Sequence, residues 1–103
     1  MTKNLKPVCV HFANPDITAL FSELFECHGV KTVKYTKVSE IPVSLPLVTE
    51  PMILNSLSKA SERICLLVGD RDSLKGHNSI TIEQPLTVPK IERSIRNFIE
   101  NLK

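Results

Sequence analysis

The sequence predicts a single α/β domain over residues 1–103, with a five-stranded parallel sheet, about three helices and two long loops in place of helices. Short apolar runs rich in β-branched residues alternate with segments whose apolar residues recur every three or four positions. A chain of 103 residues, 42% hydrophobic and 23% charged, also has the size and composition of one compact globular domain. Alternating strands and helices are typical of a parallel sheet with helices on its faces.

The first strand and the first helix lie at the beginning of the chain. Residues 7–13 form an apolar run that predicts a strand buried on both faces. Asn14 can cap the helix that follows, Pro15 suits its first position, and Asp16 suits the positive end of its dipole. Gly29 is expected to end this helix. The apolar stripe of the helix consists of Ile17, Leu20, Phe21, Leu24 and Phe25.

The middle of the chain is less regular. Lysines interrupt the apolar pattern of residues 30–38, which favours a strand near the edge of the sheet. Two prolines exclude a normal helix over residues 39–46, so we expect a loop there. A short strand over residues 45–49 and a helix that begins at Pro51 should follow. The inner face of that helix is expected to comprise Ile53, Leu54, Leu57 and Ala60.

Two strands and a helix complete the predicted domain. Residues 64–69 form an almost continuous apolar run, which predicts a buried strand. Residues 70–78 are polar and contain a glycine, which is typical of a loop. Residues 79–83 alternate as a strand does, and Thr87 can cap a final helix. The inner stripe of this helix is expected to be Val88, Ile91, Ile95, Phe98, Ile99 and Leu102.

Composition argues against several classes of protein. The net charge of +2 is too small to indicate nucleic-acid binding by itself. No apolar run approaches the roughly 18 residues that span a bilayer. Cys9, Cys27 and Cys65 lie in apolar segments and lack the spacing of a zinc site. We therefore expect reduced core thiols in a cytoplasmic protein, and no metal.

The segment over residues 82–86 resembles part of a known family. A strand that ends at Gln84-Pro85 and turns into an amphipathic helix is similar to the end of a response-regulator receiver domain. The order of five strands, with helices after the first, third and fifth, resembles that family over nearly the whole chain. The resemblance implies a flavodoxin-like, receiver-like sheet and a cis bond between Gln84 and Pro85.

The positions that carry receiver chemistry are altered in this sequence. Receivers have a pair of acids after the first strand that hold Mg²⁺, and this chain offers only Asp16 there. The phosphoacceptor aspartate has no counterpart, because the third strand ends in Thr49 and Glu50. Gln84 replaces the lysine that neutralises the acyl phosphate. The degenerate receiver positions are Asn14, Asp16, Thr49, Glu50, Gly69, Asp70, Gln84 and Pro85.

The resemblance therefore implies a pseudo-receiver, similar to the degenerate receiver and linker domains of hybrid sensor histidine kinases such as that of the Rcs phosphorelay. We expect no catalysis by the isolated domain and no cofactor. Its partners would be a kinase core, a receiver or a phosphotransfer domain, in the cytoplasm or on the cytoplasmic side of a membrane-anchored sensor kinase. No contact with nucleic acid or membrane is expected. The sequence leaves open whether the domain forms a homodimer. The interaction candidates on the last helix are Lys90, Arg93, Arg96 and Phe98.

Other interpretations stay open from the sequence. A small α/β enzyme or phosphocarrier would have its site at the carboxyl ends of the strands. Glu50 is either an acidic mimic of a phosphorylated state or a solvated residue, and His11 is either a phosphoacceptor or a packed side chain. Residues 70–72 could bind a cation, although a charged surface turn is the simpler interpretation. Cys9 lies within a strand, which favours an inert thiol over a phosphocysteine.

Overall fold

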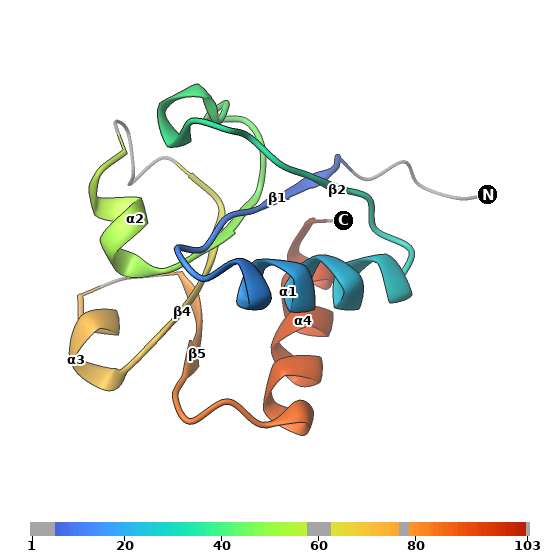
Figure 1. Cartoon of the computed structure of the whole chain (residues 1–103). Coiled ribbons are helices and arrows are strands. Elements are labelled where there is room, and N and C mark those ends of the chain that lie inside the picture. The colour runs from blue at the N-terminus through green and yellow to red at the C-terminus, as the bar shows by residue number, and fades with distance from the viewer. Residues whose placement is uncertain (1–5, 58–62, 77–78, 103) are drawn as a thin grey trace.

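The computed structural model describes residues 6–57, 63–76 and 79–102 (Figure 1). Its centre is a five-stranded sheet in the order β2-β1-β3-β4-β5, and every pair of neighbouring strands is parallel. The strands are β1 (Val8–Val10), β2 (Thr32–Val33), β3 (Leu47–Thr49), β4 (Cys65–Gly69) and β5 (Ile80–Glu83). This strand order is flavodoxin-like, so the predicted fold class is confirmed.

Helices lie on both faces of the sheet. They are α1 (Pro15–Cys27), α2 (Pro51–Asn55), α3 (Arg71–Leu74) and α4 (Val88–Leu102), with a 3₁₀ turn η1 (Val38–Glu40) between β2 and β3. The long helices α1 and α4 lie side by side on one face (Figure 1). The short elements α2 and η1 cover the other face.

Alternation along the strands divides the core into two layers. In β4, Leu66 and Val68 face α1 and α4, whereas Cys65 and Leu67 face α2. The layer under α1 and α4 contains Val8, Val10, Phe12, Phe21, Phe25, Val30, Val48, Leu66, Val68, Ile82, Ile91, Ile95, Phe98 and Ile99. The layer under α2 is smaller and contains Cys9, Ile41, Leu47, Leu54, Leu57, Cys65 and Leu67.

Some observed elements differ from the prediction in length or in type. The strand predicted over residues 30–38 has only the two residues of β2, at the sheet edge as predicted. The loop predicted over residues 70–78 contains the four-residue helix α3, because the Asp70 side chain accepts a hydrogen bond from the Ser73 amide and caps a turn. Ala60, predicted on the inner face of the second helix, lies outside the described residues.

Several side chains are placed differently from the prediction. Leu20, predicted in the apolar stripe of α1, and Ile64, predicted at the start of a buried strand, are exposed. Phe98 was predicted both in the inner stripe of the last helix and as an interaction candidate, and only the first is correct. Its ring is 1% exposed and packs edge-on against Phe25, with ring centroids 6.1 Å apart. Val88 is 70% exposed because it lies in the first turn of α4, outside the packed stripe. Cys27 is exposed at the end of α1, whereas Cys9 and Cys65 are buried as predicted.

Two backbone features agree with the prediction. Gly29 follows α1 with a φ of +80°, a conformation that costs glycine little because it has no Cβ atom. The Gln84–Pro85 peptide bond is cis. In the part of the chain that the structure describes, no helix has both the length and the apolar character needed to cross a membrane.

Candidate functional site

The carboxyl ends of the parallel strands meet at one rim of the sheet, which is where open α/β folds bind ligands. Glu50 follows β3 directly and reaches across this rim to the loop after β1. Its Oε2 accepts a hydrogen bond of 2.9 Å from the backbone amide of Ala13. The Glu50 carboxylate therefore joins two rim loops that are far apart in the sequence.

Thr49 connects the same two strands from within the core. It is fully buried, and its Oγ1 donates a hydrogen bond of 2.5 Å to the backbone oxygen of His11. A buried hydroxyl must have a partner, because leaving it unpaired costs about 1–3 kcal/mol. Thr49 is thus a structural residue in this protein.

Asp70 serves as the cap of α3. Its Oδ1 accepts hydrogen bonds from the backbone amide of Ser73, at 2.9 Å, and from the Ser73 hydroxyl. These bonds hold the pKa of the exposed Asp70 carboxyl below its usual value. The neighbouring Gly69 permits the tight turn, since a Cβ atom there would lie 2.8 Å from Ser73 Oγ and 3.3 Å from Pro51 Cδ.

The remaining predicted rim residues have local roles or none. Asn14 caps α1 by accepting a 2.8 Å hydrogen bond from the Asp16 amide, while the Asp16 side chain is exposed. The backbone amide of Gln84 donates to the oxygen of Gly69 at 2.9 Å. The exposed Gln84 side chain makes no hydrogen bond with another described residue. Among the residues that the structure describes, no three His, Cys, Asp or Glu side chains are grouped so that they could hold a metal ion.

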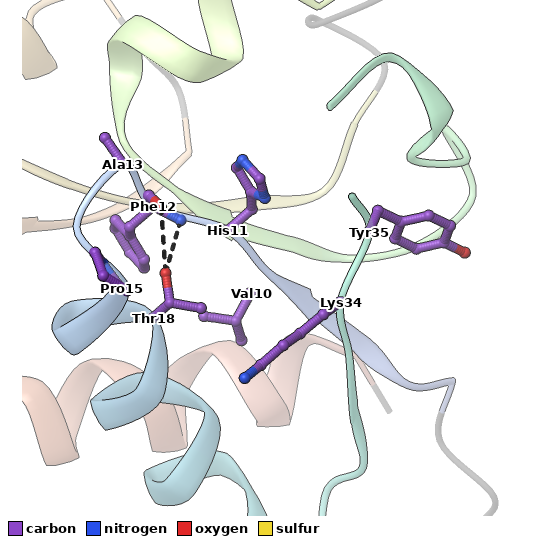
Figure 2. Close-up of a pocket in the computed structure, with 8 residues that line it drawn as sticks. All are labelled: Val10, His11, Phe12, Ala13, Pro15, Thr18, Lys34 and Tyr35. Carbon is purple, nitrogen blue, oxygen red and sulfur yellow. Dashed lines mark hydrogen bonds between the residues drawn. The ribbon is translucent and has the colours of Figure 1, made fainter. Parts of the chain in front are cut away.

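A hollow of about 240 Å³ opens at this rim between the loop after β1 and the segment after β2 (Figure 2). Figure 2 shows the His11 ring and the Lys34 side chain beside the hollow, with the Tyr35 hydroxyl directed away from it. Thr18 helps to shape it, because its Oγ1 bonds both the amide and the carbonyl of Phe12. The lining residues are Val10, His11, Phe12, Ala13, Pro15, Thr18, Lys34 and Tyr35.

Of these lining residues, the sequence analysis considered only His11 as a functional candidate, and Thr18, Lys34 and Tyr35 are among those that it missed. One signal was present, because Lys34 and Tyr35 directly follow β2, whose carboxyl end lies at the same rim. The half-buried His11 ring and the exposed Lys34 ammonium form no hydrogen bond with other described residues. Both groups can therefore donate to a small anion, and His11 is also a nucleophile.

The predicted interaction residues of α4 differ from one another in the structure. Lys90 is occupied, since its Nζ donates to the backbone oxygens of Glu83, at 2.8 Å, and Pro85, at 3.0 Å. Lys90 thereby occupies the backbone oxygen of Glu83 at the end of β5, which is an edge strand of the sheet. Arg93 and Arg96 are exposed and form no ion pair with another described residue.

Comparison with known proteins adds no relative. No family model, no curated protein sequence and no solved structure matches the chain. Functional conclusions therefore depend on the geometry of the rim and of the surface.

Proposed function

We propose that this chain is a non-catalytic, receiver-like module of a two-component phosphorelay protein, and that it docks kinase, receiver or phosphotransfer domains in the cytoplasm. The flavodoxin-like strand order supports the proposal, because receiver domains share it. The altered rim supports the non-catalytic part. The docking part draws on Arg93 and Arg96 of α4, which are exposed and form no ion pair with another described residue.

One observation carries the non-catalytic part: the carboxylates that follow β3 and β4 already accept hydrogen bonds from backbone amides of the protein. Glu50 accepts from the Ala13 amide, and Asp70 caps α3 through Ser73. An acyl phosphate needs a divalent ion and a nearby cation to balance its charge. The position where receivers have that cation carries the neutral amide of Gln84.

Exposure to a small phosphodonor tests this part of the proposal. We expect that acetyl phosphate with Mg²⁺ leaves the mass of the protein unchanged. Beryllium fluoride with Mg²⁺ should leave the amide resonances of Ala13, Glu50, Asp70 and Gln84 in place, because no acid pair is available to hold the ion. An authentic receiver treated in parallel provides the control. A phosphorylated aspartate or glutamate at the rim would contradict the proposal.

The outward face of α4 is the surface that we assign to docking. Arg93 and Arg96 are one turn apart on this helix and both are exposed, so they present two adjacent positive charges. Opposite charge on a partner would raise the association rate and favour one orientation. The preferred partner surface is therefore acidic.

Titration of the labelled chain with kinase-core, receiver and phosphotransfer domains encoded in the same genome tests the docking part. We expect amide shifts on α4 with at least one of them, and weaker binding after the double change Arg93→Glu and Arg96→Glu. The matched control is the double change Lys31→Glu and Lys75→Glu, which alters net charge equally at exposed positions that are not on α4. Equal loss of binding in both variants, or no shift with any domain, would refute the assignment.

The hollow at the rim favours a second candidate function, a small-ligand or phosphocarrier domain. His11 and Lys34 both line that hollow, and in Figure 2 the His11 ring and the Lys34 ammonium group point in different directions. Lys34 would therefore have to turn toward the ring to balance the charge of a phosphoryl group on it. Phosphoramidate, a phosphodonor for histidine, would then add one phosphoryl group that is lost in acid. The His11→Gln variant should not gain it. Absence of labelling in the unchanged protein would reject this candidate.

A further inference from the structure

A second hollow, of about 560 Å³, lies at the opposite end of the strands from the rim. Residues at the end of α2, together with Arg63 just before β4, meet the segment between β2 and β3 around this hollow. In Figure 1, α2 and the segment between β2 and β3 lie together at the upper left. Its lining residues are Lys37, Val38, Ser39, Ser56, Leu57 and Arg63. The rim residues discussed above do not contribute to it.

Arg63 is the distinctive residue of this hollow. Its side chain is more than nine-tenths buried, with a relative exposure of 8%. Nη1 donates to the backbone oxygen of Pro42 at 3.1 Å, and Nη2 donates to that of Ile41 at 3.0 Å. Nε is buried and has no hydrogen-bond partner among the described residues. Within the described chain, the guanidinium uses two of its five donors, and both meet neutral acceptors.

The charge of Arg63 is uncompensated among the described residues. The two ion pairs of the described chain join His28 to Glu92 and Arg71 to Glu83, and neither involves Arg63. Burying a charge without a counter-charge is unfavourable, because the charge loses its interaction with water. A second cation, Lys37, lies in the same hollow, and none of the described residues that line it is acidic. The hollow therefore concentrates positive charge that an anion would stabilise.

We propose that this hollow binds the phosphate group of a small phosphorylated molecule. The guanidinium and the Lys37 ammonium match the charge of a phosphate dianion, and the Ser39 hydroxyl is a further donor. Ser56 acts as an acceptor only, because its hydroxyl already donates to the Ile53 oxygen at 2.7 Å. The volume falls in the range of small-molecule sites, so it can hold an organic group besides the phosphate.

Nuclear magnetic resonance of the whole chain tests the site directly. The probes are inorganic phosphate and phenyl phosphate, each added at an ionic strength held constant with sodium chloride, with acetate as a carboxylate comparison. We expect saturable shifts of the Arg63 Nε–H signal and of the Ser39 amide with both phosphates. Phenyl phosphate should bind more tightly than phosphate, and acetate more weakly by about threefold or more.

Variants separate this site from general charge attraction. Arg63 is buried and its replacement could unfold the domain, so Lys37→Gln is the informative change. We expect it to weaken phosphate binding about threefold or more, whereas Lys75→Gln, at an exposed position outside the hollow, leaves binding unchanged. Linear, non-saturating shifts would overturn the proposal, as would equal effects of the two variants. An Arg63 Nε–H signal that stays in place when either phosphate is added would also overturn it.

This inference is independent of the docking proposal. The hollow lies at the amino end of β4, whereas the phosphodonor test concerns the carboxyl ends of the strands. Failure of either experiment therefore leaves the other proposal standing.

Discussion

Phe98→Ala is expected to lower the free energy of unfolding by about 3–5 kcal/mol. The ring is fully enclosed between α4 and the sheet and contacts the Phe25 ring edge-on. Truncation removes its apolar burial and leaves a cavity that the neighbouring side chains can only partly fill. A domain of about 100 residues is commonly stable by only 5–15 kcal/mol, so this single change would remove a large share of the stability.

Urea denaturation followed by circular dichroism measures this loss. The matched control is Asn97→Ala, one position earlier on the same helix, where the side chain is exposed. We expect that change to alter the stability by less than about 0.5 kcal/mol. A loss below about 1 kcal/mol for Phe98→Ala would mean that the ring lies at the surface, as an interaction residue would, and would contradict the packing of α4.

The three thiols are expected to differ in reactivity by orders of magnitude. Cys27 is exposed at the end of α1, whereas Cys9 and Cys65 lie in the core layer under α2. Burial raises the pKa of both core thiols from 9.0 to about 11, and the positive charge of Arg63 offsets this only in part. Since the thiolate is the reactive form, the core thiols are both shielded and protonated at pH 8.

Ellman's reagent at pH 8 measures this difference. One thiol per chain should react within seconds to minutes, and the other two only as fast as the protein unfolds. The Cys27→Ser variant should lose the fast phase alone, because the slow thiols are the two in the core. Simultaneous reaction of three thiols in the native protein would contradict the burial of Cys9 and Cys65.

The raised thiol pKa values also predict a loss of stability in alkali. Folding favours the protonated thiols, so their contribution is complete below pH 9 and is lost as the pH rises toward 11. At pH 10 the loss is on the order of 1 kcal/mol per thiol. Urea denaturation at pH 8 and pH 10 measures it, and the Cys9→Ala, Cys65→Ala double variant should show a smaller difference between the two pH values. If stability falls equally between pH 8 and pH 10 in the unchanged protein and in the double variant, the two core thiols do not cause the loss.

The sequence predicted the sheet and its long helices because their signals are local. The apolar run of β4, the stripe of α1 with its Asn14 cap, and the spacing in α4 each follow from neighbouring residues. The shortest elements, β2 and α3, were predicted less well. β2 keeps only two paired residues, and the short helix α3 depends on the Asp70–Ser73 cap within a polar segment.

The candidate site was only partly accessible to sequence reasoning. The carboxyl ends of β1, β3, β4 and β5 were expected at one rim, and they are. The partners of the rim side chains were not predictable, because Glu50 bonds the Ala13 amide 37 positions away. Lys90 was expected to be free for a partner, but its ammonium reaches back to the carbonyls of Glu83 and Pro85.

The sequence by itself determined the parallel α/β architecture, because that follows from the order of local apolar patterns along the chain. Only the tertiary structure decided what the charged groups contact. Arg63 reads in the sequence as an ordinary charge before a strand, yet folding buries it against the carbonyls of Ile41 and Pro42. Such contacts depend on segments far apart in the sequence, so no local pattern encodes them.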